Sequence, residues 1–270
     1  MAEPVSPPAL RDLGGGRRWG SARTIGALIL REMTTSYGRS PGGYLWAVIE
    51  PVAAIAVLTG LFALAFQAPR LGTNFPIFYA TGVIPFLMFT DLAGKTAAAL
   101  TFSKALLAYP SVTFADAIIA RFALNLATQV MVAAIVLAGI LWAFDTRTAP
   151  DLGLIVLALA MVAVCALGVG VVNCLLFTLL PVWQRVWSIA TRPLFLLSGV
   201  LFVFDDVPAP YDDWLWWNPL IHAVGVMRRA FYFNYAGEYV SVAYVVGLGM
   251  GLTVTGLLFL RRYHRVLLNR

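Results

Sequence analysis

The sequence has 270 residues and a formal net charge of +6, and 60% of its residues are hydrophobic while only 12% are charged. Soluble domains carry about 25% charged residues, so this composition excludes a soluble globular domain and indicates an integral membrane protein. The length leaves room for about six membrane-spanning helices of ~20–25 residues each.

Positive charges are concentrated before the first apolar run and after the last one. These arginines are Arg11, Arg17, Arg18, Arg23, Arg31, Arg39, Arg261, Arg262, Arg265 and Arg270. Basic residues that flank membrane spans stay on the cytoplasmic side, so both chain ends are expected in the cytoplasm and the number of spans is even. This distribution explains the net charge without a nucleic-acid partner.

The region before the first span is predicted to have two parts. Residues 1–20 are rich in Pro, Gly and Arg and contain no apolar core of a signal peptide, so we expect a disordered cytosolic tail. Residues 21–43 are predicted to form an amphipathic helix on the membrane surface, ended by an elbow at residues 40–43. Four apolar side chains share one face of this helix: Ile25, Leu28, Ile29 and Met33.

Six apolar runs follow in a transmembrane domain of residues 44–270, which predicts an all-α integral membrane fold. The predicted spans are residues 44–66, 75–100, 112–144, 152–180, 186–204 and 239–260. Residues 181–185 are expected to form a tight inner turn between the fourth and fifth spans. Close helix contacts are predicted at two pairs of glycines, Gly168 with Gly170 and Gly247 with Gly251.

Several charged and polar residues lie inside the predicted spans, where they are costly and often functional. Asp91 and Lys95 are four positions apart, and we interpret them as a structural ion pair. A polar side of the third span is formed by Asp116, Arg121, Asn125 and Gln129. For Arg121 and Arg192, a structural role and a role on the path of an anionic substrate both stay open.

The segment 205–238 differs in composition from the spans and is expected outside the membrane or partly inserted into it. Four aspartates and three tryptophans precede an apolar stretch, residues 220–233, that is too short to span. This pattern predicts a pair of re-entrant or interfacial helices, the second with Asn218 as its N-cap before Pro219. For the tryptophans, a membrane-interface belt and a sugar-binding surface remain alternatives.

The chain offers no evident catalytic or metal site. Cys165 and Cys174 are nine positions apart, or ~13 Å along a helix, so they cannot form a disulfide within it. His222 and His264 are the only histidines, and neither has metal-ligand neighbours in the sequence. Residues 94–96 resemble the end of a phosphate-binding loop, but the first glycine of that motif is missing. We expect no metal, no cofactor on this chain and no enzymatic activity, and therefore a motor on another polypeptide.

Two stretches resemble the permease subunits of type-2 ABC exporters, and specifically the branch that exports polysaccharides. The first runs Arg31-Glu32-Met33, Tyr37-Gly38-Arg39, Gly43-Tyr44-Leu45-Trp46-Ala47 and Glu50-Pro51, and the second runs Asn218-Pro219-Leu220, His222, Arg228 and Ala230-Phe231. The resemblance implies a bacterial inner-membrane half-channel for capsular polysaccharide, with O-antigen and teichoic acid exporters as relatives. The implied partners are a second copy of the chain, two ATPase subunits that bind ATP and magnesium, the polymer, and periplasmic or outer-membrane export proteins.

The same resemblance implies roles for individual residues. Contacts with the ATPase subunit are expected at Arg31, Glu32, Lys104, Leu107 and Tyr109. The polymer channel and its gate are expected at Arg39, Tyr44, Trp46, Arg121, Trp187 and Arg192. The outer re-entrant cap is expected to use Trp214, Trp217, His222 and Arg228.

Two other classes of protein remain as alternatives. An integral-membrane enzyme acting on lipid-linked sugars would need convergent acidic or histidine residues, and the available set is Asp205, Asp206, Asp212, Asp213 and His222. A proton-coupled transporter would work without a separate ATPase.

Overall fold

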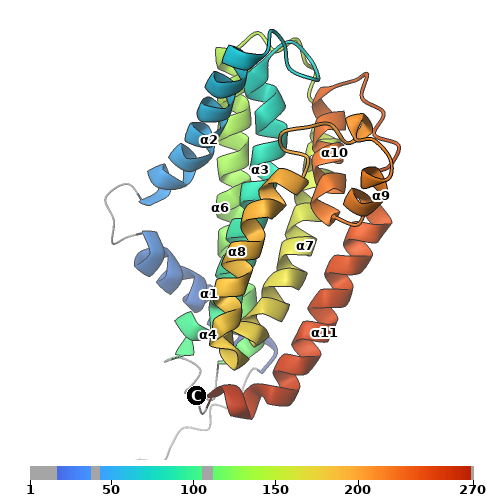
Figure 1. Cartoon of the computed structure of the whole chain (residues 1–270). Helices are drawn as coiled ribbons and strands as arrows, with labels where there is room; N and C mark the ends of the chain where they lie inside the picture. Colours follow the sequence, from blue (N-terminus) through green and yellow to red (C-terminus); the bar gives the residue numbers. More distant parts are fainter. Residues whose placement is uncertain (1–16, 38–42, 105–111, 269–270) are drawn as a thin grey trace, which may run out of the picture.

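The computed structural model describes residues 17–37, 43–104 and 112–268, and within these ranges every regular element is a helix (Figure 1). The elements are α1 (Arg17–Glu32), the π-helix η1 (Met33–Tyr37), α2 (Gly43–Ala65), α3 (Phe75–Ala97), α4 (Ala99–Phe102), α6 (Phe114–Ala143), α7 (Leu152–Leu179), α8 (Pro181–Leu197), the 3₁₀ helix η2 (Phe204–Asp206), α9 (Tyr211–Trp216), α10 (Pro219–Phe231) and α11 (Val242–Leu268).

Five helices in the described part of the chain are long and apolar enough to cross a membrane: α2, α3, α6, α7 and α11. They supply 21 to 30 residues each, against the ~20 that the hydrocarbon core requires. The predicted all-α integral membrane class is therefore confirmed.

Helix α7 lies at the centre of the bundle and packs against α3, α10 and α11. Two small residues permit this close packing. A Cβ added at Gly170 would lie 2.6 Å from the Cβ of Thr96, and one added at Gly168 would collide with the backbone of α11. The predicted contact role of these two glycines is confirmed.

The predicted contact through Gly247 and Gly251 is wrong within this chain. An added Cβ at either position meets no atom within 4 Å, whereas one at Gly249 would lie 2.7 Å from the Val164 carbonyl oxygen. Gly256 also faces α7, 2.8 Å from Val171. Positions 249 and 256 are seven residues apart and share a helical face, which is the face that meets α7.

Two predicted boundaries also need correction. The expected turn at residues 181–185 is the first turn of α8, because Pro181 occupies the first helical position, where its missing N–H costs nothing. The fifth span was predicted to end at residue 204, but α8 ends at Leu197. Gly199 follows shortly after with a positive φ of 73°, which a helix does not continue through. At the N-terminus, α1 already starts at Arg17, within the expected disordered tail, because the glycine run of residues 14–16 stops just before it.

Helix starts follow the capping residues in the sequence. Thr113 and Asp116 form a reciprocal capping box at the start of α6, and the Asp151 carboxylate accepts hydrogen bonds from the first amides of α7. The predicted N-cap of α10 is confirmed, since the Asn218 side chain accepts a hydrogen bond from the Leu220 amide and Pro219 follows it.

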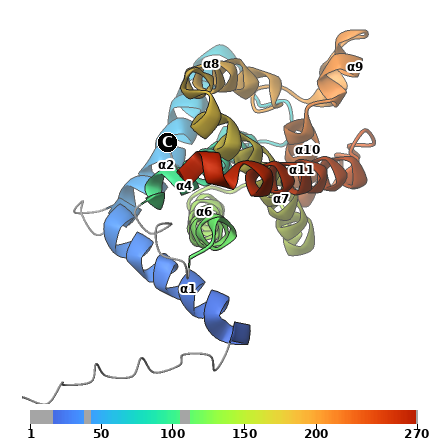
Figure 2. The ribbon, with the colours of Figure 1, turned by 90° about the horizontal axis from the view of Figure 1, so that it is seen from below.

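Helix α1, α4 and the C-terminal end of α11 lie at one end of the bundle, here called the α1 end (Figure 1). Seen from this end, α1 runs across the bundle beside α6 (Figure 2). The opposite end carries the connections from α2 to α3 and from α6 to α7 (Figure 1). Toward the α1 end, helix α2 leans away from the bundle (Figure 1). A polar recess lies between α2, α3 and α6.

Candidate functional site

A buried ion pair joins α1 to α6. The Glu32 carboxylate lies 3.2 Å from the Arg121 Nη1, and the two residues are only 6% and 9% exposed. The buried Asn125 side chain also donates a hydrogen bond to Glu32. Glu32 and the buried Leu28 are four positions apart and lie on the bundle-facing side of α1.

Arg121 extends this connection to α3 and α4. Its Nε donates a hydrogen bond of 2.7 Å to the carbonyl oxygen of Lys95, in the last turn of α3. Carbonyls in the last turn of a helix lack partners within the helix, and a positive charge there is favoured by the helix dipole. The guanidinium also lies 4.2 Å from the centre of the Phe102 ring. One side chain therefore holds four elements together.

The charge of Glu32 depends on its arginine partner. Burial raises the pKa of the Glu32 carboxyl above its ordinary value of 4.5, while the Arg121 guanidinium and the Asn125 amide oppose this rise. Without Arg121, the pKa of the Glu32 carboxyl would be raised further. A second contact at the other end of α1, from the Ser21 hydroxyl to Asp116, fixes the helix against α6 at two points.

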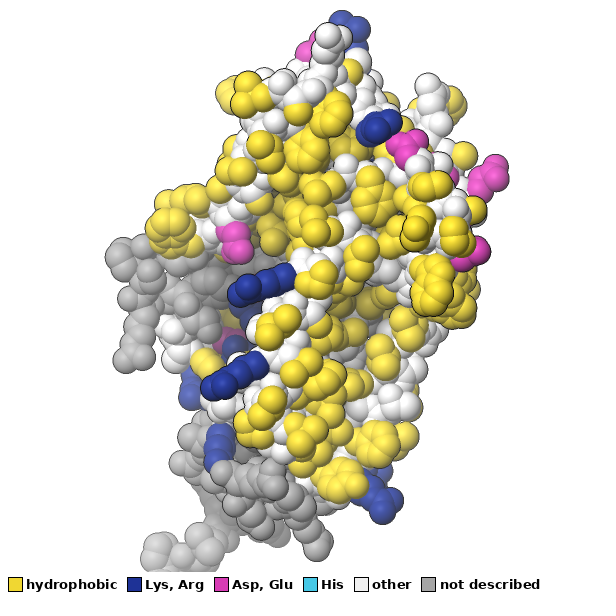
Figure 3. Space-filling model, viewed as in Figure 1, with side chains coloured by type: hydrophobic (Ala, Val, Ile, Leu, Met, Phe, Trp, Pro, Cys, Tyr) yellow, Lys and Arg dark blue, Asp and Glu magenta, His cyan; other side chains and the backbone are white. Residues whose placement is uncertain are grey.

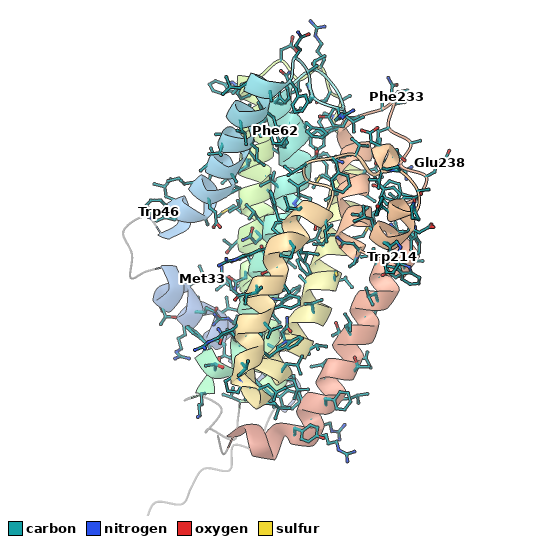
Figure 4. The ribbon with its side chains drawn as sticks, viewed as in Figure 1. Met33, Trp46, Phe62, Trp214, Phe233 and Glu238 are labelled. Carbon is teal, nitrogen blue, oxygen red and sulfur yellow. The ribbon has the colours of Figure 1, made fainter. Side chains whose placement is uncertain are left out.

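A polar recess of about 410 Å³ lies between α2, α3 and α6. Its polar lining consists of Trp46, Glu50, Thr90, Asp91, Lys95 and Gln129. Trp46 lies near the end of α2 that approaches α1, and it is 63% exposed (Figure 4). An amphipathic recess of this size, opening between apolar helices, has the dimensions and mixed chemistry of a small-molecule or sugar-ring site.

Three of the polar side chains in the recess, Asp91, Lys95 and Gln129, are bonded to one another. The Lys95 ammonium lies 2.9 Å from Asp91 Oδ2, and the Gln129 amide donates a hydrogen bond of 2.7 Å to the same oxygen. The ion pair predicted from the spacing of Asp91 and Lys95 is confirmed. Residues 94–96 do not form a phosphate-binding loop, because they belong to the last turn of the apolar helix α3.

Helix α8 carries two of the residues expected to line the channel, Trp187 and Arg192. None of its 17 described residues is buried, and its only basic residues are Arg185 and Arg192. Figure 3 shows basic side chains in the middle and lower part of the molecule, on the side where α1 lies. Trp187 is half-buried and Arg192 is exposed.

The segment between α8 and α11 holds the four residues expected in the outer cap. His222 and Arg228 are fully buried, whereas Trp214 and Trp217 are exposed, and Figure 4 places Trp214 on the outer side of α9. The Arg228 Nη1 donates a hydrogen bond of 2.6 Å to the Phe202 carbonyl, and its guanidinium lies 4.7 Å from the centre of the Phe78 ring. Arg228 therefore supports the irregular backbone after α8.

His222 joins α10 to α9 and to the start of α11. Its Nε2 lies 2.8 Å from the Trp216 carbonyl, and its Nδ1 lies 3.2 Å from the Ser241 amide nitrogen. Because a carbonyl only accepts and an amide N–H only donates, these partners select the neutral imidazole protonated on Nε2. Burial lowers the pKa of His222, which favours the same neutral form.

The structure does not assemble the aspartates and His222 into a catalytic group. Asp206 pairs with Arg70 at 3.9 Å, and in the described ranges no three His, Cys, Asp or Glu residues converge as a metal site would require. Asp206 and His222 are thus engaged by different partners, Arg70 for the first and Trp216 and Ser241 for the second.

The remaining predicted residues divide by position. Arg31 and Lys104 are exposed at the α1 end, and Arg31 lies 5.9 Å from the Phe102 ring centre. Tyr44 lies in the first turn of α2. Arg39, Leu107 and Tyr109 lie outside the described residues.

Sequence reasoning missed the connection between two groups of residues that it had assigned to different roles. Glu32 was expected to contact an ATPase and Arg121 to line a channel, but they bond to each other. Asn125 and Gln129 belong to the predicted polar side of the third span, so their facing inward could be read from spacing. Phe102 carried no polar signal and could not be found in this way.

The structure defines an integral membrane protein with a polar recess inside an apolar helical bundle. The chain belongs to the ABC-2 type transporter family, whose profile matches residues 23–232. It is 29% identical over 246 residues to the polysialic acid transport protein KpsM of Escherichia coli, an alignment that covers 91% of this chain and 95% of KpsM.

Two further relatives are named for capsule export. The capsule polysaccharide export inner-membrane protein BexB of Haemophilus influenzae is 25% identical over 245 residues, with 90% of this chain and 92% of BexB covered. The protein of the same description from Neisseria meningitidis serogroup B, CtrC, is 26% identical with the same coverage. The resemblance to type-2 ABC exporters is thus confirmed.

Proposed function

We propose that this chain is the transmembrane half-channel of an ATP-driven exporter that moves polysaccharide across the bacterial inner membrane. Similarity over nine-tenths of the chain to inner-membrane proteins named for capsule polysaccharide export supports this function. The structural observation that carries it is the polar recess beside Trp46.

The chemistry of the recess suits sugar rings. Hydroxyl groups both donate and accept hydrogen bonds, and the recess offers carboxylates at Glu50 and Asp91, an amide at Gln129 and an ammonium at Lys95. The exposed Trp46 indole supplies an apolar face on which a ring can stack. An anionic, lipid-linked capsular chain is the expected substrate, with the exposed Arg185 and Arg192 of α8 available to its charges.

We infer six membrane crossings, with both chain ends in the cytoplasm. Helix α1 and the C-terminal end of α11 lie at the same end of the bundle, and α8 runs back from that end (Figure 1). With α8 as the return crossing, the five long helices and α8 give an even number of crossings. The proposed re-entrant cap then consists of α9 and α10, held by the Asn218 bond to the Leu197 carbonyl and by the Arg228 bond to the Phe202 carbonyl.

A second copy of the chain would complete the channel. Only 11% of the spanning part of α2 is buried, and α8 has no buried residue along its described length. Large apolar side chains exposed on α8 include Val182, Ile189 and Leu196. A second α8 facing the first would cover these side chains and bring the α8 arginines of both copies to a shared path.

The energy source would be two separate ATPase subunits that hold ATP and magnesium, so that no cofactor is needed on this chain. The exposed Arg31 and Lys104 at the α1 end suit contacts with such subunits. Periplasmic or outer-membrane export proteins would receive the polymer. Family membership supports the ATPase subunits as partners, and the charges at the α1 end suit their binding.

The test is export in cells that carry the gene. Deletion should leave polysaccharide inside the cell and remove it from the surface, and the wild-type gene should restore surface polymer. Trp46→Ala and Gln129→Leu should restore it poorly, because they remove the stacking face and the amide of the recess. Trp142→Ala is the matched control and should restore surface polymer fully. Trp142 is 90% exposed, lies at the C-terminal end of α6 and does not line the recess. Unchanged surface polymer after deletion would contradict the proposal.

A further inference from the structure

A continuous set of polar contacts leads from α1 to the recess. It begins at the Glu32 carboxylate, passes through the Arg121 guanidinium to the Lys95 carbonyl, and reaches the Lys95 ammonium on the same residue. The ammonium contacts Asp91, which also accepts the hydrogen bond from Gln129. Each link lies between 2.7 and 3.2 Å, and the last three residues line the recess.

The first link in this set is difficult to stretch. Glu32 and Arg121 are almost completely buried, so water cannot readily replace either partner when they separate. The guanidinium is planar and offers donors in fixed directions, which lets it bind Glu32 and the Lys95 carbonyl together. A displacement of α1 therefore has to move Arg121 and the last turn of α3 or break a buried charge pair.

The last turn of α3 is connected to the recess by Lys95 itself. Its backbone accepts the Arg121 hydrogen bond while its side chain pairs with Asp91 in the recess lining. By contrast, the hydrogen bond from Ser21 of α1 to Asp116 of α6 ends at the capping box of α6, and Asp116 does not line the recess. The Glu32–Arg121 pair, in contrast, is connected through Lys95 to the recess.

We propose that Glu32 and Arg121 are positioning residues that couple the position of α1 to the shape of the polar recess. This inference rests on the proposed function, in which α1 receives the ATPase. When the ATPase moves α1, the pair moves Lys95 and rearranges the Asp91, Lys95 and Gln129 side chains around the substrate. A pair with only a structural role would hold the helices together without transmitting this change.

The first experiment measures polymer exported per ATP hydrolysed by the complete transporter in proteoliposomes. Glu32→Gln and Arg121→Met should each lower this ratio at least about fivefold, because coupling energies of this kind correspond to about 5- to 150-fold effects. The double variant should be no worse than the worse single variant, since residues that act as a unit are not additive. Arg147→Gln is the matched control: it breaks the exposed Asp145–Arg147 pair at the other end of the bundle and should leave the ratio unchanged.

The second experiment reads the recess directly and needs no polymer. Ala47 lines the recess, so Ala47→Cys provides a thiol there whose maleimide labelling rate can be measured with and without ATP. ATP should change the rate in the parent complex, and Glu32→Gln should abolish this change while ATP hydrolysis continues.

The outcomes separate the two proposals. Equal losses of export and ATP hydrolysis in Glu32→Gln, with an unchanged ratio and an unchanged labelling response, would overturn the coupling role but leave the exporter function intact. A wild-type complex that exports no polysaccharide would overturn the proposed function, while the labelling response would still decide the coupling role. A variant that fails to assemble is replaced by Glu32→Asp, which keeps the charge but shortens the reach to Arg121 and should lower the ratio by an intermediate amount.

Discussion

Gly168 of α7 and Gly249 of α11 face each other so closely that neither position has room for a side-chain carbon. A Cβ at Gly249 would lie 2.7 Å from the Val164 carbonyl oxygen, and one at Gly168 would lie 2.9 Å from the Cβ of Leu252 as well as against the Gly249 backbone. These atoms belong to helix backbones and cannot rotate away. The contact between α7 and α11 therefore depends on glycine at both positions.

Gly168→Ala should destabilise the protein by about 1–3 kcal/mol, because the added methyl group forces the two helices apart. The measurement is thermal unfolding of the purified protein in detergent. Gly247→Ala is the matched control, since its Cβ meets no atom within 4 Å and alanine favours a helix by about 1 kcal/mol over glycine. An unchanged melting temperature for Gly168→Ala would show that α11 can shift without loss.

Arg228→Gln should destabilise the protein by about 1–3 kcal/mol, because the Phe202 carbonyl loses its donor and the Phe78 ring loses its cation. The neighbouring Arg229 is exposed, so Arg229→Gln should stay within about 0.5 kcal/mol of the wild type. Thermal unfolding of both variants gives the comparison. If Arg228→Gln melted with the wild type, burial of the cation would cost as much free energy as its two contacts contribute.

Acidification should weaken the packing of α10 through His222. Its pKa in the folded protein is lowered below the ordinary value of 6.5, so the unfolded chain binds the proton first as pH falls. The stabilising contribution is complete above about pH 6.5 and is lost progressively below it, by at most about 1.4 kcal/mol at pH 5.5.

The measurement for His222 is the difference in unfolding free energy between wild type and His222→Asn at pH 7.5 and at pH 5.5. This difference should shrink at the lower pH, because the variant lacks the titrating group. A difference that is the same at both values would mean that His222 does not titrate in this interval.

Neither cysteine should react with a maleimide in the native protein. Cys165 and Cys174 are 1% and 0% exposed in α7, so labelling requires unfolding of the bundle. Asp213→Cys supplies an exposed thiol on α9 as the positive control. Rapid labelling of the wild-type protein under native conditions would contradict the central position of α7.

The sequence allowed the membrane helices to be predicted because long apolar runs have few other stable structures. It was less informative about the ends of these helices. Pro181 is read equally well as a turn and as the first residue of a helix, and only the packing of α8 decides between them. The glycines of α11 show the same limit. The sequence allows a helix contact through Gly247 and Gly251 or through Gly249 and Gly256, and only the second pair packs against α7.

The candidate site could be predicted in its components but not in its connections. The spacing of Asp91 and Lys95 predicted their ion pair, because it arises within one helix. Glu32 and Arg121 are 89 positions apart in the sequence, and although α1 has one acidic residue and α6 one basic residue, no local pattern indicates that these two helices pack together. Burial of Glu32 is a property of that meeting rather than of its own segment.

The separate locations of the recess and the two arginines of α8 have a consequence for substrate selection. The recess combines two carboxylates with one ammonium, whereas α8 carries two arginines and no acidic residue. A repeating unit would therefore be recognised by its ring hydroxyls in one place and by its negative charge in another. Added salt screens exposed charges beyond about 8–10 Å, so higher ionic strength should reduce the preference for acidic over neutral polymers while leaving ring recognition in place.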